Sequence, residues 1–134
     1  MPDEETFETA LDDLMDELWP AVGKLNASAD LLGRLDGMRL VYADWLEERG
    51  DAHAAAQRWL VHRQKFPRYS GKSWDWWRYG DRPDCLAEDL PATIWDRLPG
   101  KPSDANRHCK EYPTRRSAER ALYKALMLLN LLDQ

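Results

Sequence analysis

The stretch RLVYADWLEERGD, residues 39–51, decides the fold of the N-terminal half of this chain. It continues a run in which apolar residues recur at intervals of three and four, which is typical of one helix face. The apolar residues of that run are Leu31, Leu35, Met38, Tyr42 and Trp45. Gly50 is suited to end the helix because glycine takes the left-handed conformation without a steric penalty, and Asp51 is suited to cap the next one. We therefore predict two helices joined at Gly50-Asp51 in a tight antiparallel hairpin.

The segments on either side of this stretch are also predicted to be helical. Asp36-Gly37 are expected to interrupt the second helix, with Asp36 capping a shorter helix that runs to Arg49. The helix after the hairpin is expected to bury one stripe, namely Ala52, Ala55, Trp59, His62 and Phe66. An acidic amphipathic helix is expected at the N-terminus, capped by Asp3, with the stripe Phe7, Leu11, Leu14, Leu18 and Val22.

Residues 67–113 contain six of the eight prolines, which excludes long helices there. Residues 73–79 are rich in strand-favouring aromatics and predict a short strand, with residues 107–112 as its antiparallel partner. Residues 91–98 fit a short helix that begins at Pro91. Because Trp74, Trp76 and Trp77 are large and apolar, at least two of them are expected to be mostly buried.

The last segment, residues 115–132, is the clearest helix, with Thr114 as its cap and a stripe that contains Ala118, Leu122, Ala125, Leu129 and Leu132. We thus predict a mainly α (α+β) fold: N-terminal helices with a hairpin around Gly50, an irregular aromatic middle with at most a small β-hairpin, and a long C-terminal helix. Residues 1–134 are expected to form a single domain, made of a helical part (1–66), a Trp- and Pro-rich part (67–113) and the C-terminal helix (114–134).

Composition and charge limit the class of protein. The 134 residues are 43% hydrophobic and carry a net charge of −5. Residues 1–36 hold ten acids against Lys24 and Arg34, a net charge of −8, so the charge is unevenly distributed. No stretch approaches the roughly 20 apolar residues that span a bilayer, and the acidic start is unlike a secretory signal. A cytoplasmic protein with no membrane partner is the expectation.

Residues Arg39 to Asp51 resemble the signature of the bacterial "repeat-companion" domain. That family is a short helical module found beside repeat and regulatory domains, and with flanking helices the resemblance covers residues 5–66. It implies a helical fold and an association with multidomain proteins. The family has no assigned activity, so the resemblance implies no catalytic residues.

Asp44 is the one carboxylate inside the apolar part of this signature. It is either a buried acid with a functional role or a residue that accepts hydrogen bonds from a neighbouring backbone or from Arg58 across the hairpin. The second interpretation is favoured.

Three side chains in the loop-rich region are candidate metal ligands or nucleophiles, namely Cys85, His108 and Cys109. In a metal site, His53 or His62 would be the further ligand. Zinc sites usually show paired ligands two to four residues apart, and this set lacks that spacing. A Cys–His nucleophile pair has no protease-like signature or glycine-rich oxyanion loop beside it. We predict no catalytic residue, no metal and no cofactor, and a protein that is not an enzyme.

The segment 58–82 offers an alternative function, because cations that follow phosphates and aromatics that stack on bases are typical of single-strand binders. The candidate nucleic-acid residues are Arg63, Lys65, Arg68, Lys72, Trp74, Trp76, Trp77 and Arg78. The competing interpretation is that the tryptophans are core, and a sequence pI near 5.2 favours that interpretation.

The favoured function is a non-enzymatic protein-interaction or adaptor module in a bacterial assembly. The C-terminal helix is apolar nearly all the way round, so Met127, Leu128 and Leu131 need a second cover beyond the domain's own core. That cover is the N-terminal helix, a second copy of the chain or another protein. We expect an intermolecular contact.

Overall fold

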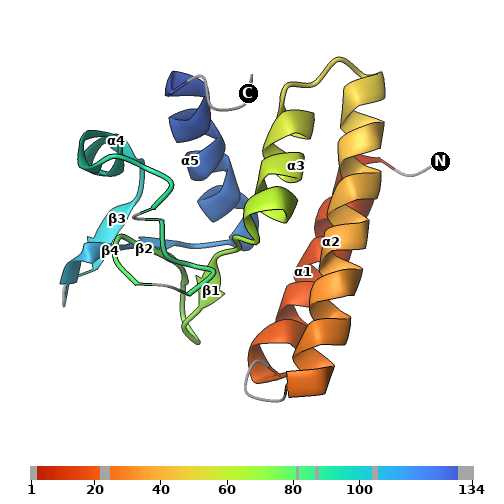
Figure 1. The fold of residues 1–134 in the computed structure, drawn as a ribbon, viewed down its shortest axis with the longest axis horizontal. Coiled ribbons are helices and arrows are strands. Elements are labelled where there is room, and N and C mark those ends of the chain that lie inside the picture. Colours follow the sequence, from red (N-terminus) through yellow and green to blue (C-terminus); the bar gives the residue numbers. More distant parts are fainter. Residues whose placement is uncertain (1–2, 22–24, 81, 87, 104–105, 130–134) are drawn as a thin grey trace. The chain divides into compact units, whose positions relative to one another are not determined.

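The computed structural model describes residues 3–21, 25–80, 82–86, 88–103 and 106–129 (Figure 1). It is mainly helical, with a small antiparallel sheet and a long C-terminal helix, which confirms the predicted fold class. The elements are α1 (Glu4–Ala21), α2 (Leu25–Glu48), α3 (His53–Arg63), β1 (Arg68–Tyr69), β2 (Trp74–Trp77), α4 (Ala92–Arg97), β3 (Lys101–Ser103), β4 (Asn106–Tyr112) and α5 (Arg115–Leu128). The chain divides into two compact units, Met1–His62 and Arg63–Gln134.

The first unit is built on α1 and α2, which lie side by side (Figure 1). Asp3 caps α1 as predicted, because its Oδ1 accepts a hydrogen bond of 2.9 Å from the backbone N–H of Thr6. The core between the helices includes a stacked pair, Phe7 and Tyr42, whose ring centroids are 5.0 Å apart. The other fully buried apolar side chains here include Leu11, Met15, Leu18, Leu35 and Leu46.

The expected break in the second helix is wrong. Asp36 does not cap a shorter helix, because α2 runs without interruption through Asp36-Gly37. The buried positions before and after Gly37 belong to one continuous stripe on α2. Packing of that stripe outweighs the local cost of a mid-helix glycine, which is about 1 kcal/mol relative to alanine.

The end of α2 confirms the predicted role of Gly50. Its φ is 70°, in the left-handed region. The N–H of Asp51 donates to the carbonyl of Leu46 at 3.0 Å, and the N–H of Gly50 donates to the carbonyl of Glu47 at 2.9 Å. These two bonds form a Schellman motif, which satisfies carbonyls that the helix end leaves open.

Replacing Gly50 by valine is expected to lower the free energy of unfolding by about 1–2 kcal/mol, because a β-branched residue is strained at positive φ. A Cβ at this position meets nothing within 4 Å, so the effect comes from the backbone alone. Urea unfolding followed by circular dichroism measures it. Gly50→Asn is the control and should lose less, since asparagine tolerates this conformation; a Gly50→Val variant as stable as the wild type would contradict the motif.

The buried face of α3 differs from the predicted stripe. The structure buries Ala54, Ala56, Gln57, Trp59 and Leu60, whereas Ala52 and His62 are exposed. The predicted stripe did not include Gln57, a polar side chain that occupies a core position here. The amide oxygen of Gln57 accepts a 2.9 Å hydrogen bond from Nη1 of Arg39, and both residues are 1% exposed. The hairpin of α2 and α3 is thus joined by long polar side chains.

The second unit holds a four-stranded sheet in the order β1-β2-β4-β3. The predicted antiparallel pairing is confirmed: Trp74 lies opposite Tyr112, and Trp77 lies opposite Cys109. Short strands β1 and β3 extend this pair at its two edges. Beside the end of β2, Cys85 forms a parallel bridge with Trp77, so that the two cysteines flank this tryptophan.

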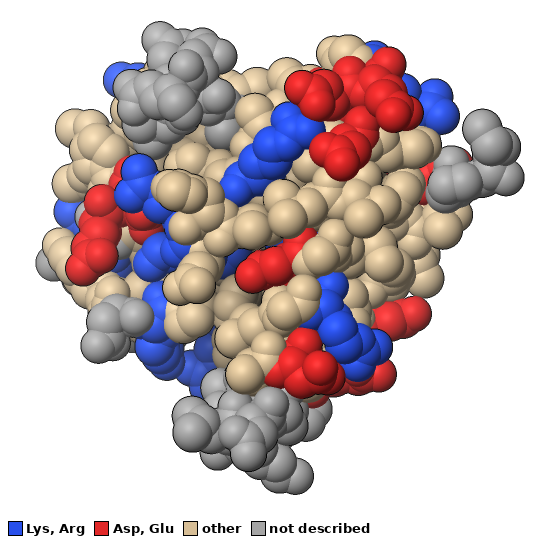
Figure 2. All heavy atoms as spheres, turned by 45° about the vertical axis from the view of Figure 1, so that its right-hand side comes forward, with Lys and Arg blue, Asp and Glu red and all other residues tan. Residues whose placement is uncertain are grey.

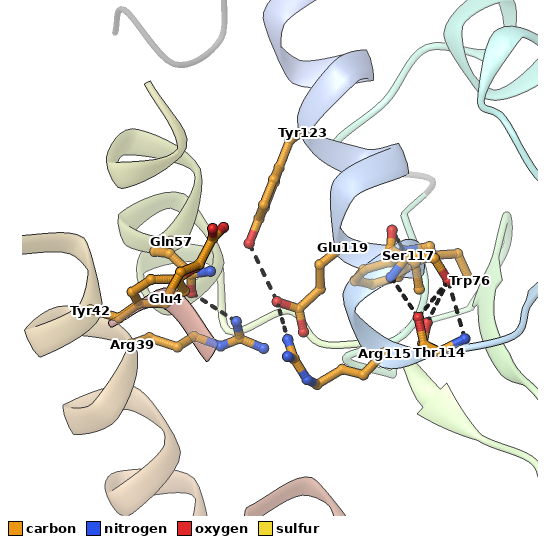
Figure 3. A network of polar contacts seen from close by, with 11 residues as sticks. Glu4, Arg39, Tyr42, Gln57, Trp76, Thr114, Arg115, Ser117, Glu119 and Tyr123 are labelled. Atoms are coloured by element: carbon orange, nitrogen blue, oxygen red, sulfur yellow. Dashed lines mark hydrogen bonds and ion pairs between the residues drawn. The ribbon is translucent and has the colours of Figure 1, made fainter. Parts of the chain in front are cut away.

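Helices α4 and α5 pack against the sheet and accept hydrogen bonds from side chains of β2 and β4. Trp76 is 0% exposed, and its Nε1–H donates to the carbonyl of Ala118 in α5 at 2.8 Å. Lys110, opposite Trp76, donates from Nζ to the carbonyls of Trp95 and Leu98 at the end of α4. The predicted short helix after Pro91 and the Thr114 cap of α5 are both confirmed, the latter as a capping box with Ser117 (Figure 3).

Candidate protein-interaction surfaces

A groove of about 410 Å³ lies between α1 and α2 in the first unit. Two successive turns of α1 and about one turn of α2 line this groove. The lining residues are Ala10, Asp13, Leu14, Glu17, Arg34, Gly37 and Met38. Asp13 and Glu17 are exposed, and Nη1 of Arg34 pairs with a carboxylate oxygen of Glu17 at 3.4 Å, with both side chains more than half exposed. The groove therefore combines an apolar floor with charged edges.

Gly37 is one of the residues that line this groove. A Cβ at Gly37 meets nothing within 4 Å, so the backbone of α2 is accessible there. Glycine in a helix interior costs roughly 1 kcal/mol relative to alanine. Steric crowding in the described structure therefore does not require glycine at this position.

The end of α5 carries a second apolar surface, which includes two of the three predicted partner-binding residues. Met127 is 44% exposed and Leu128 is 64% exposed. The predicted core stripe is confirmed at Ala118, Leu122 and Ala125, which are buried. The predicted residues Leu131 and Leu132 lie outside the described residues. In the described part of α5, the buried stripe is thus accompanied by two exposed apolar side chains.

The tryptophans of the basic and aromatic segment lie mainly in the core. Trp74 is 8% and Trp76 is 0% exposed, which confirms that at least two of the three are buried, and Trp77 is half-buried. Trp74 packs on Tyr69 with ring centroids 5.1 Å apart. Neither Trp74 nor Trp76 presents an open ring face on which a base could stack.

Several cations of this segment are held by acidic groups or by the backbone. Lys65 donates to the carbonyl of Cys85 at 2.7 Å and lies 3.4 Å from Asp89, which also pairs with Arg63 at 3.7 Å. Lys72 is exposed, and Arg68 and Arg78 are half-buried. The guanidinium of Arg78 lies 5.0 Å from the ring centroid of Tyr79, whose side chain is 56% exposed. Arg82 also lies over an aromatic ring, 5.8 Å from the ring centroid of the half-buried Trp77, so among the described residues of this segment the pair of Arg78 and Tyr79 has the more exposed ring.

The structure does not bring the described cysteines and histidines together as a group of three or more side chains. Among the described residues, no group of three or more His, Cys, Asp or Glu side chains has metal-binding geometry. His108 packs edge-on against Tyr79, with ring centroids 5.0 Å apart. Burial raises the pKa of Cys109 to about 12, with Asp75 and Glu111 adding to the effect. Because the thiolate is the nucleophile, such a thiol is poorly suited to attack a substrate at neutral pH.

Asp44 is an exposed acid and not a buried one. Its side chain is 76% exposed, and it accepts a 3.0 Å bond from Nη2 of Arg58, the partner that the sequence favoured. The same nitrogen donates to Glu47 at 2.8 Å. The carboxylate of Asp44 thus links α2 to α3 at the surface.

The sequence did not predict several charged side chains that are buried in the second unit. Arg115 and Glu119 form a 2.9 Å ion pair within α5, with side chains 0% and 1% exposed. The hydroxyl of Tyr123 donates to Glu119 at 3.3 Å, as Figure 3 shows. Burial lowers the pKa of Lys110. The spacing of residues 115 and 119 was a signal for the pair, but nothing in the pattern shows that it is buried.

Two aspartates near the sheet are also buried. Desolvation raises the pKa of both Asp75 and Asp84, and it is opposed at Asp75 by a 2.7 Å hydrogen bond from Ser73. Asp84 is paired with Arg82 at 3.1 Å. Each carboxylate therefore has a short-range structural partner.

Comparison with protein-family models, with curated proteins and with solved structures found no match to this chain. No helix in the described ranges is both long enough and apolar enough to cross a membrane.

Proposed function

We propose that this protein is a non-enzymatic protein-interaction module, which binds another protein through apolar surfaces left open on its helices. The observation that carries the proposal is the exposure of Met127 and Leu128 at the end of α5, next to a buried stripe on the same helix. Contiguous exposed apolar side chains on a soluble domain mark interaction sites. The resemblance of residues 39–51 to repeat-companion domains agrees with an adaptor in a bacterial multidomain assembly, and this remains a prediction.

The charge pattern supports an interaction surface of this kind. Figure 2 shows acidic and basic side chains interspersed on one face of the molecule, with uncharged residues between them. Protein interfaces typically have an apolar centre and a polar rim. Several ionisable groups buried in the second unit, in contrast, are engaged in ion pairs and hydrogen bonds within the fold.

A change of both Met127 and Leu128 to lysine tests this proposal. We expect the double variant to keep its circular dichroism spectrum, because both side chains are exposed, and to lose association with the partner or with a second copy by at least about tenfold. Sedimentation of the purified chain and co-purification of a stoichiometric protein are the measurements. Arg120→Glu, at an exposed α5 position, is the control and should leave association intact.

The outcome that contradicts the proposal is a monomeric wild type with no stoichiometric partner, whose double-lysine variant unfolds. In that case the end of α5 belongs to the core only.

Nucleic-acid binding is the second candidate, favoured by the open pair of Arg78 and Tyr79 and by the charge of the second unit. Residues 63–134 carry 14 basic and 10 acidic side chains, a net charge of +4. Binding of a fluorescent single-stranded oligonucleotide that weakens steeply with salt, and is lost in Tyr79→Ala, would favour this function over protein binding.

A further inference from the structure

The groove between α1 and α2 has features that specify the kind of partner it accepts. Its floor contains Ala10, Leu14, Gly37 and Met38, all apolar or without a side chain. Val41, four residues after Gly37, is 56% exposed, so the apolar surface continues along α2 past the groove. An apolar strip that runs along a helix pair fits a row of side chains from another helix better than a compact small molecule.

The edge of the groove is negative. Asp13 and Glu17 line it, and Arg34, the single cation among the described lining residues, is paired with Glu17. The other exposed acids on α1 are Glu5, Asp12 and Asp16. Residues 1–62 carry 14 acidic and 5 basic side chains, a net charge of −9. Complementary charge steers association and selects the partner, so the groove favours a cationic one.

We infer that this groove binds a basic amphipathic helix of a partner protein. The apolar side chains of that helix lie on Leu14, Gly37 and Met38, and its lysines or arginines lie against Asp13 and Glu17. This inference rests on the proposed function as an interaction module, but it places a binding surface on the first unit, separate from the end of α5.

Gly37→Leu separates a binding role from a structural role. Leucine has a higher helix propensity than glycine and has space at this position, so the variant should unfold at a melting temperature roughly 2–5 °C above the wild type. The same side chain fills the groove, so binding should be lost. If Gly37 has only a structural role, the variant should show the higher melting temperature but keep its binding.

The matched control is Gly33→Leu. Gly33 lies one turn earlier in α2, a Cβ there also meets nothing within 4 Å, and the residue does not line the groove. It should give a similar rise in melting temperature without loss of binding.

The probe is an 18-residue fluorescent peptide of lysine and leucine, with leucines spaced three and four apart. Fluorescence anisotropy with the full chain should show binding that weakens at least about tenfold in Gly37→Leu and less than about twofold in Gly33→Leu. Asp13→Asn combined with Glu17→Gln should weaken the binding of the peptide. Arg34→Gln should strengthen the binding, because it releases Glu17 from its ion pair. Peptides with glutamate in place of lysine, or serine in place of leucine, should not bind.

Equal binding by Gly37→Leu and wild type would overturn the inference, as would equal binding of the glutamate peptide. Loss of binding in the Met127→Lys, Leu128→Lys variant but not in Gly37→Leu would also overturn it, and would leave the proposed function standing. If the wild type sediments as a dimer that Gly37→Leu dissociates, the occupant is a second copy, and the assignment to a partner helix is wrong.

Discussion

Trp76→Ala is expected to lower the free energy of unfolding of the second unit by about 3–5 kcal/mol. The side chain is fully buried on the face of the sheet that α5 covers. Its removal leaves a cavity and deprives the carbonyl of Ala118 of a hydrogen-bond donor, which adds a desolvation cost. Urea unfolding followed by far-ultraviolet circular dichroism measures the change.

Two further variants separate the effect of the lost ring volume from that of the lost hydrogen bond, and a buried ring from an exposed one. Trp76→Phe keeps most of the ring volume and removes the donor, so it should lose less than the alanine variant. Tyr79→Ala removes an aromatic ring of the same region that is 56% exposed, and should change stability by less than about 1 kcal/mol. A Trp76→Ala variant as stable as Tyr79→Ala would show that Trp76 is not core.

Glu119→Gln is expected to lower the free energy of unfolding by about 3 kcal/mol, because it removes the opposite charge beside the buried guanidinium of Arg115. The amide keeps the size of the side chain and an oxygen for the hydroxyl of Tyr123, so the loss reports the charge and not a cavity. Urea unfolding followed by far-ultraviolet circular dichroism measures this loss.

Replacing both partners should behave differently from replacing one. Arg115→Met combined with Glu119→Leu removes both charges of this pair and should recover most of the loss. Lys124→Gln, an exposed position on the same helix, should stay within about 0.5 kcal/mol of the wild type. If Glu119→Gln is as stable as Lys124→Gln, the pair does not contribute to stability.

Much of the fold followed from local pattern. The caps at Asp3, Gly50 and Thr114 each depend on one residue type with one backbone requirement, which a sequence displays directly. The pairing of β2 with β4 followed from the aromatic-rich segment 73–79, for which residues 107–112 were the predicted antiparallel partner. These signals are local, so they do not require knowledge of tertiary packing.

The errors arose where tertiary contacts override local preference. Gly37 was expected to break α2, but packing on both sides of it keeps the helix continuous. The stripe on α3 was misplaced because Gln57, a polar residue, is buried against Arg39. The pair of Arg115 and Glu119 was equally hidden, since charged residues at i and i+4 are usually solvated.

The candidate sites were predictable to different degrees. The apolar surplus that places Met127 and Leu128 in solvent is visible in the sequence of the last helix. The groove is not, because it is formed by residues of α1 and α2 that come together only after the helices pack. The burial of Trp74 and Trp76 showed that aromatic residues beside cations are in this case mainly core.

The most direct test of the central claim, that this chain binds proteins through its open apolar helix surfaces, is amide chemical-shift mapping of the ¹⁵N-labelled full chain. The chain is titrated first with the lysine–leucine peptide and then, in a separate sample, with a single-stranded oligonucleotide. We predict that the peptide shifts the amides of Ala10, Leu14, Gly37 and Met38, and that the oligonucleotide leaves the spectrum unchanged at physiological salt. A silent peptide titration, together with oligonucleotide shifts at Lys72, Arg78 and Tyr79, would contradict the claim.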